Sequence, residues 1–183
     1  MTETPEKPSI YEETFAKSDK TDAILVVQGK KLHVNKALLS YHSDFFTALF
    51  DSEEDSGEDP VEIHIADVEF EDFATFLSLV MHNPLKVTEP NAERLLALGE
   101  QYQIPGSKRH VELFLIRIEK EKMEKIRLAD RYDMKDLLSN GVLQFKTAIE
   151  FKNLRKNEIY QALSDAAKAA ICHRFLDLYD NRR

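Results

Sequence analysis

Residues 22–50 read DAILVVQGKKLHVNKALLSYHSDFFTALF, and this stretch decides the fold. The β-branched run AILVV is followed by Gln-Gly and by KKLHV, a pattern typical of a β-hairpin in which Gly29 takes positive φ. Apolar residues then recur at helical spacing, with Asn35 suited to cap one short helix and Ser43 suited to cap the next. The stretch therefore predicts a hairpin followed by two short helices.

The rest of the chain predicts one more strand and then helices. The segment VEIHI alternates as a strand does, and the pattern that follows it is almost wholly helical. LALGEQYQIP (96–105) and IRLADRYDMK (126–135) align with an offset of 30 residues, and in both a small residue precedes a tyrosine by three positions. Such a repeat is typical of stacked helical hairpins. The predicted fold class is α+β and mostly helical, with a small three-stranded sheet followed by additional helices.

Charge divides the chain into two parts. The 183 residues carry 25 Lys and Arg against 33 Asp and Glu, a net charge of -8, which argues against a nucleic-acid binder that neutralises phosphates. Residues 1–119 hold 11 basic and 23 acidic side chains, whereas residues 120–183 hold 14 and 10. The change of sign near residue 120 indicates two units. Residues 1–9, which are polar and contain two prolines, predict a flexible N-terminus.

Targeting signals and cysteine content indicate the compartment. No apolar run reaches the roughly 18 residues of a membrane span, and MTETPEKPS lacks the parts of a signal peptide. Cys172 is the one cysteine, which agrees with a reducing environment. We expect a soluble protein of the cytoplasm, the nucleus or both, with no membrane partner.

Two groups of residues suggest metal or catalytic chemistry. Asp22, His33 and His42 would form a cluster only if the fold brought them together, and a single cysteine removes the usual thiolate sets for zinc. The acids of DSEEDSGEDPVE, which begins at Asp51, match most ligand positions of an EF-hand loop. However, Ser56 stands where glycine is required, and a strand follows in place of a helix. We expect a solvated acidic loop, in which Ser52 and Ser56 are candidate phosphorylation sites.

Other signs of catalysis are weak. Cys172 and His173 are adjacent, and adjacent helix positions point about 100° apart, so a half-buried thiol is expected instead of a nucleophile. The sequence has no glycine-rich phosphate loop, no GxSxG motif and no metalloprotease motif. We expect no enzymatic activity, catalytic residue, metal or cofactor.

The opening stretch resembles the start of the BTB/POZ domain. That family's usual pattern is Asp, an apolar strand, a Gly turn and then F/L-x-A/V-H-K/R-x-x-L-x-x-x-S-x-F-F-x-x-x-F. The segments VEIHIADVEFEDFATFLSLV and NAERLLALGEQYQIPGSKRHVELFL are also similar to it. The resemblance covers residues 10–119 and is strongest to nematode MATH-BTB proteins, although these 183 residues contain no MATH domain. Residues 120–183 resemble the BACK-like or three-box-like helical extension that often follows a BTB core.

The resemblance implies a homodimer built through the N-terminal helix, the first strand and the first core helices. The implied interface positions are Ile10, Phe15, Asp22, Leu32, His33, Lys36 and Leu38. Asp22 and Lys36 match the family's charged pair at the base of this interface. Where water is excluded, a carboxylate and an ammonium are tolerable only as partners, and losing one would cost about 3–5 kcal/mol.

The resemblance also implies a surface for a type-3 cullin, because many members are substrate adaptors of ubiquitin ligases. The candidate contact residues are Phe45, Phe46, Asp51, Glu54, Tyr102 and Ile104. The family's hydrophobic-x-Glu element aligns near Glu54, where DSEEDSGED offers no apolar side chain. The missing apolar anchor argues against tight cullin binding.

The function that follows is that of a protein-protein interaction module. We expect a homodimeric BTB protein that acts as a substrate adaptor of a cullin-RING ubiquitin ligase, with an unknown substrate protein. One alternative is a dimerisation scaffold without cullin, or a transcriptional co-regulator that binds partner peptides at the dimer groove. Another is a metal-dependent protein that uses the acidic loop.

Overall fold

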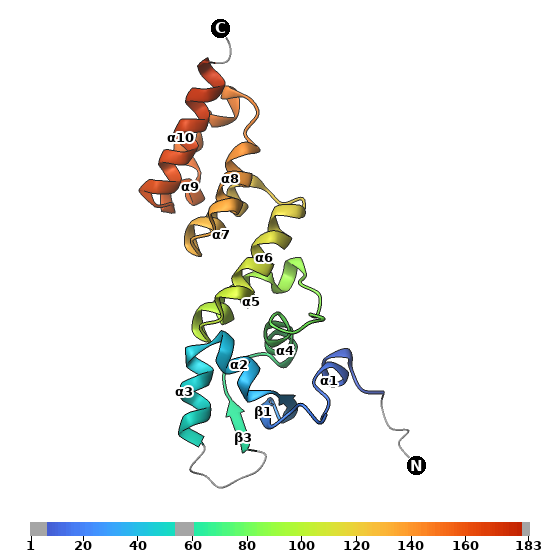
Figure 1. Ribbon diagram of the computed structural model, residues 1–183. Helices are drawn as coiled ribbons and strands as arrows, with labels where there is room; N and C mark the ends of the chain where they lie inside the picture. Colours follow the sequence, from blue (N-terminus) through green and yellow to red (C-terminus); the bar gives the residue numbers. More distant parts are fainter. Residues whose placement is uncertain (1–6, 54–60, 181–183) are drawn as a thin grey trace. The chain divides into compact units, whose positions relative to one another are not determined.

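The computed structural model describes residues 7–53 and 61–180 (Figure 1). The chain divides into two compact units, Met1–His110 and Val111–Arg183, which we call unit 1 and unit 2. Unit 1 contains a small sheet and several helices, and unit 2 is helical. No helix among the described residues is long and apolar enough to cross a membrane.

The sheet of unit 1 has three strands: β1 Ala23–Val27, β2 Lys30–Val34 and β3 Val61–Ile65. Their order is β2-β1-β3, with β1 antiparallel to β2 and parallel to β3, so that Ala23 pairs with both Val34 and Val61. All five residues of β1 are buried because it is the central strand, and the unbroken apolar run AILVV meets this requirement. The predicted hairpin and third strand are confirmed.

The hairpin turn also fixes the start of a distant helix, α4 (Phe70–Ser78). Gly29 has φ 76°, as predicted, and Gln28 also has positive φ, at 50°. The Gln28 side chain accepts a hydrogen bond from Phe70 N at 3.1 Å and donates one to Glu69 Oε2 at 3.1 Å. This cap at the N-terminus of α4 offsets the cost of a non-glycine residue in the left-handed region.

The other helices of unit 1 begin at polar caps. They are α1 Ile10–Thr14, α2 Lys36–His42, α3 Asp44–Glu53 and α5 Glu89–Gln101. Ser9 caps α1, and Asn35 Oδ1 accepts from Leu38 N at 2.8 Å at the start of α2. Ser43 Oγ accepts from Phe46 N at 3.1 Å and so caps α3. Both caps predicted for the opening stretch are confirmed.

The sequence repeat corresponds to two similar helical hairpins. The helices after α5 are α6 Pro105–Arg117, α7 Lys122–Arg131 and α8 Lys135–Leu143. In each copy the residue after the tyrosine has positive φ, 52° at Gln103 and 48° at Asp133. The next N–H donates to the carbonyl of the small residue five positions earlier, at 3.1 Å in the first copy and 2.8 Å in the second. A Cβ on Gly99 would lie 2.6 Å from Ser107 Oγ, so glycine at this position lets the Ser107 side chain keep its place.

Unit 2 closes over its own apolar core. Its further elements are the 3₁₀ segments η2 Ala148–Phe151 and η3 Leu154–Lys156, and the helices α9 Glu158–Ala162 and α10 Asp165–Asp180. The buried core residues are Met123, Ile126, Val142, Phe145, Leu163, Ala167 and Ile171. Glu112 Oε1 accepts from the backbone N atoms of Asp136 and Leu137 at 3.0 and 3.1 Å, which caps α8. The predicted α+β, mostly helical class with additional helices is confirmed.

Glu150 anchors η2 to α7. Its carboxylate accepts from Lys122 Nζ at 2.5 Å, and from Lys146 N and Thr147 N at 2.9 Å each. The hydrogen bond from the Lys122 ammonium, with the two backbone donors, lowers the pKa of Glu150 from 4.5 to about 2. The folded chain therefore stabilises the charged form of the Glu150 carboxylate relative to the unfolded chain.

Glu150→Gln is expected to lower the free energy of unfolding by about 1 kcal/mol at neutral pH, an effect limited by the side chain's partial exposure. Because the folded pKa lies below the unfolded value, the stabilisation is present above pH 4.5 and is lost as pH falls toward 2. Urea unfolding at pH 7 and at pH 2.5 measures the difference. The control is Glu119→Gln at an exposed position. A gap between wild type and Glu150→Gln that stays the same at both pH values would contradict this role.

Candidate functional site

The predicted dimer positions lie at different depths in the protomer. Phe15 and Leu32 are 3% and 0% exposed, so in this fold they belong to the core of unit 1. Ile10 on α1 is 61% exposed and Asp22 is exposed. The remaining three, His33, Lys36 and Leu38, are half-buried. The exposed and half-buried positions could therefore contact a partner, whereas Phe15 and Leu32 support them from the core.

Asp22 contacts Lys36 through the backbone. Asp22 Oδ1 accepts from Lys36 N at 2.7 Å, at the first residue of α2. Asn35 Nδ2 donates to Lys20 O at 2.7 Å, so the segment before β1 is tied to the start of this helix. A carboxylate beside a helix N-terminus satisfies an unpaired N–H and interacts favourably with the helix dipole. Within one protomer, Asp22 thus has a local structural role.

The first helix lies on its own protomer. The Tyr11 ring meets the Phe70 ring edge-on, with 6.3 Å between centroids, which places α1 against α4. Phe15 O accepts from His33 N at 3.0 Å, and this bond attaches the end of α1 to β2. Burial, together with the charge and hydrogen bond of Glu71, raises the pKa of the Tyr11 hydroxyl.

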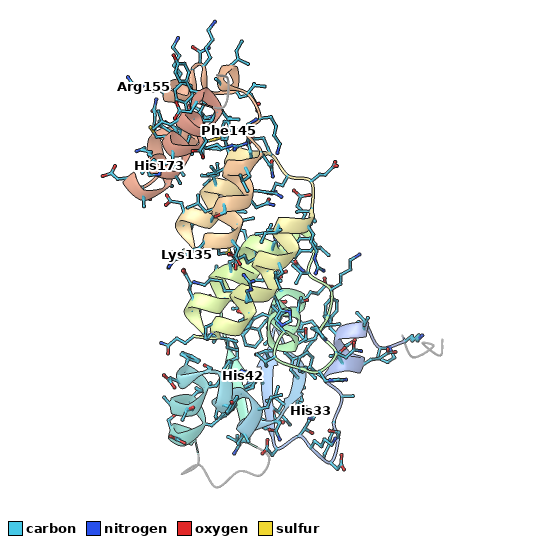
Figure 2. All side chains as sticks on the ribbon, turned by 45° about the horizontal axis from the view of Figure 1, so that its top comes forward. His33, His42, Lys135, Phe145, Arg155 and His173 are labelled. Carbon is cyan, nitrogen blue, oxygen red and sulfur yellow. The ribbon has the colours of Figure 1, made fainter. Side chains whose placement is uncertain are left out.

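A groove of 680 Å³ opens beside these elements. Its lining includes Phe15, His33, Leu38, Leu39, Leu77 and Met81, and Figure 2 labels His33. The segment after α1, strand β2, helix α2 and the end of α4 therefore surround one apolar hollow. Three predicted dimer positions, Phe15, His33 and Leu38, line it.

Three of the six residues predicted for the cullin surface, Phe45, Phe46 and Tyr102, belong to an aromatic cluster inside unit 1. Phe46, Tyr102 and Ile104 are buried, and the Tyr102 ring lies 5.7 Å from that of Phe46 and 5.0 Å from that of Phe45. Ser43 Oγ donates to Tyr102 O at 2.6 Å, which joins the start of α3 to the end of α5. Burial, together with the charge of Asp67, raises the pKa of the Tyr102 hydroxyl.

The accessible part of this surface is small. Phe45 is half-buried and Asp51 is exposed, both on α3. Tyr41 at the end of α2 is 84% exposed and was not predicted as a site residue. The signal for Tyr41 was its position two residues after the buried Leu39, on the opposite side of the helix. Glu54 and Ser56 lie outside the described residues.

The described residues hold no cluster of metal ligands, and they place Cys172 at the surface. Within residues 7–53 and 61–180, no group of three His, Cys, Asp or Glu side chains could hold a metal ion, and this includes Asp22, His33 and His42. The EF-hand positions Asp55 and Asp59 lie outside these ranges. The prediction of a half-buried Cys172 is wrong, since the thiol is exposed. α10 buries Ile171, and the next position turns toward solvent.

Comparison with known proteins shows which family this chain resembles. A BTB/POZ domain–containing protein of Caenorhabditis elegans is 32% identical over 165 residues, covering 90% of this chain and 52% of the relative. BTB and MATH domain-containing protein 36 of the same nematode is 28% identical over 172 residues, covering 92% and 53%. Kelch-like protein 24a of Danio rerio is 27% identical over 165 residues, covering 83% and 26%.

The chain spans about half the length of the two nematode relatives. The family model of the BTB/POZ domain matches residues 11–119, which is more than half of the 183 residues. This range contains the three-stranded sheet, the capped helices and the aromatic cluster around Tyr102. The chain therefore belongs to the BTB/POZ domain family.

Proposed function

We propose that this chain is a homodimeric adaptor that joins a type-3 cullin to a substrate protein inside the cell, in the cytoplasm or the nucleus. Membership of the BTB/POZ family makes it a protein-interaction module. In the proposed organisation, residues 10–119 form the dimerising core and residues 120–183 form a BACK-like helical extension. The substrate is contacted by the extension or by a second protein.

The groove beside α2 is the observation that carries self-association. It is lined by apolar side chains at predicted interface positions, and Ile10 projects from the neighbouring helix with 61% of its surface exposed. Covering apolar surface of this kind with a partner is favourable because it removes that surface from water. Light scattering with the whole chain at micromolar concentration tests the dimer, and a single-copy species would contradict it.

The exposed face of α2 and α3 supports the cullin part of the proposal. Tyr41 is 84% exposed, Phe45 is half-buried, and the two are four residues apart across the Ser43 cap. Aromatic side chains at the centre of an interface contribute much of the binding free energy. Tyr41 could supply the apolar contact that the acidic segment around Glu54 lacks.

Tyr41→Ala is expected to weaken binding to the cullin N-terminal domain about tenfold, which corresponds to about 1.4 kcal/mol, because an aromatic contact is removed. Isothermal titration calorimetry with the whole chain measures this change. Tyr179→Ala in unit 2 is the matched control, since Tyr179 is also an exposed tyrosine.

Two results would count against the adaptor. Wild-type protein with no measurable cullin affinity would leave the dimerisation scaffold or the transcriptional co-regulator as the function. Equal affinities for wild type and Tyr41→Ala would place the cullin elsewhere on the surface. Neither result depends on the oligomeric state, which light scattering reports separately.

A further inference from the structure

A row of aromatic rings in unit 2 leads from the core to the surface. Phe145 is fully buried and stacks on Phe151 at 4.5 Å between centroids. Phe151 meets Phe175 at 5.2 Å, and Phe175 stacks on Tyr179 at 6.4 Å. Tyr179 is 56% exposed. Apolar surface therefore continues along α10 from the interior to solvent.

A groove of 370 Å³ lies along this row, between α10 and the two 3₁₀ segments. Its apolar lining is Phe151, Leu154, Tyr160, Ile171 and Phe175. Its volume falls within the range of about 300–1,000 Å³ that ligand pockets occupy. Because the lining residue Cys172 is exposed, the groove is open to solvent and can receive a side chain from another molecule.

Two basic side chains, Lys152 and Arg155, also line this groove. Lys152 and Arg155 are exposed, and no acidic residue lines the groove (Figure 2 labels Arg155). Arg155 is held through its backbone, whose carbonyl accepts from Gln161 Nε2 at 3.0 Å. Within the described part of the chain, neither cationic side chain is paired with a carboxylate. By contrast, Lys122 is paired with Glu150 in the same unit.

We propose that this groove binds a short acidic peptide segment of a partner protein, with one leucine or phenylalanine as its anchor. The anchor packs on the apolar floor that Phe151 and Phe175 form, and flanking carboxylates pair with Lys152 and Arg155. Residues 120–183 carry 14 basic against 10 acidic side chains, so the surrounding field also attracts an acidic segment. The inference concerns unit 2 alone and requires neither self-association nor cullin binding.

The test is fluorescence anisotropy with the whole chain at about 0.15 M salt, where charges well separated in solvent are largely screened. The probe is the fluorescein-labelled peptide Asp-Glu-Asp-Leu-Phe-Glu-Asp-Glu. One control peptide replaces Leu-Phe with Ser-Ser, and the other replaces every acid with lysine. We expect saturable binding of the probe and at least tenfold weaker binding of each control.

Charge reversals locate the site without disturbing the core. Lys152→Glu with Arg155→Glu is expected to weaken the probe at least tenfold, because both positions are exposed and would then repel the peptide. Lys135→Glu is the matched control, an exposed lysine at the start of α8 outside the groove. Circular dichroism of each variant confirms that the helices are retained.

Cys172 provides an independent readout, since it is the one cysteine in the chain and lies in the groove. Saturating probe is expected to slow its alkylation by iodoacetamide at least fivefold, while the Ser-Ser peptide has no effect. The proposal is overturned if wild type does not bind the probe, or if the Ser-Ser peptide binds equally well. It is also overturned if Lys135→Glu weakens binding as much as the double reversal, or if bound probe leaves the alkylation rate unchanged.

Discussion

Tyr102→Ala is expected to lower the free energy of unfolding by about 3–5 kcal/mol. The Tyr102 ring is 3% exposed and lies within 5.0–5.8 Å of the rings of Phe45, Phe46, Phe73 and Phe76. Removing it leaves a cavity between aromatic side chains of α3 and α4, which cannot collapse without moving the backbones of these helices. Urea unfolding followed by circular dichroism measures the change, since the chain contains no tryptophan.

Tyr102→Phe is the matched control for this cavity. It keeps the ring and removes only the hydroxyl, so we expect a loss below about 1.5 kcal/mol. The hydrogen bond from Ser43 is unaffected by either change, because it ends on the Tyr102 backbone carbonyl. A loss below 1 kcal/mol for Tyr102→Ala would show that the cluster is not a main source of stability.

Leu38→Glu is expected to raise the dissociation constant of the proposed dimer at least about 100-fold, or about 2.7 kcal/mol. Leu38 lines the apolar groove beside α2, and a partner seated there would exclude water from the new carboxylate. The fold should persist, because Leu38 N lies in the first turn of α2, where a glutamate is favourable. Sedimentation equilibrium over a range of concentrations measures the constant.

Tyr41→Glu is the control for added charge, since Tyr41 lies on the same helix outside the groove lining. Asp22→Asn with Lys36→Ala tests the charged pair itself. Asparagine keeps the oxygen that accepts from Lys36 N, so the contact within the protomer is retained while both charges are removed. An unchanged dissociation constant for Leu38→Glu would exclude the groove as the interface, and one for the double variant would exclude the pair.

Local signals explain what could be predicted of the fold. The apolar run of β1, the caps at Asn35 and Ser43, and the repeat that ends α5 and α7 all depend on neighbours within a few residues. Turn and cap chemistry acts over that distance, so it is readable along the chain. The positive φ of Gln28 was missed because its compensation comes from Phe70 N, 42 residues away.

The candidate sites were less predictable, because the sequence pattern does not distinguish an aromatic residue that binds from one that packs. Phe46, Tyr102 and Ile104 were predicted for a cullin surface, and they are buried in the core of unit 1. Tyr41 is exposed in the same region and was not selected. Cys172 was expected to be half-buried, and it lies open beside an aromatic groove.

The sequence by itself determined the family, the strand order along the chain and the caps at Asn35 and Ser43, because these follow from local propensity and from spaced motifs. Only the tertiary structure decided which of its aromatic and charged residues face solvent. It also decided that Asp22 meets the backbone of Lys36, and that Lys152 and Arg155 share a groove with Phe151 and Phe175. Exposure and convergence are set by packing between segments far apart in sequence, and no local pattern encodes them.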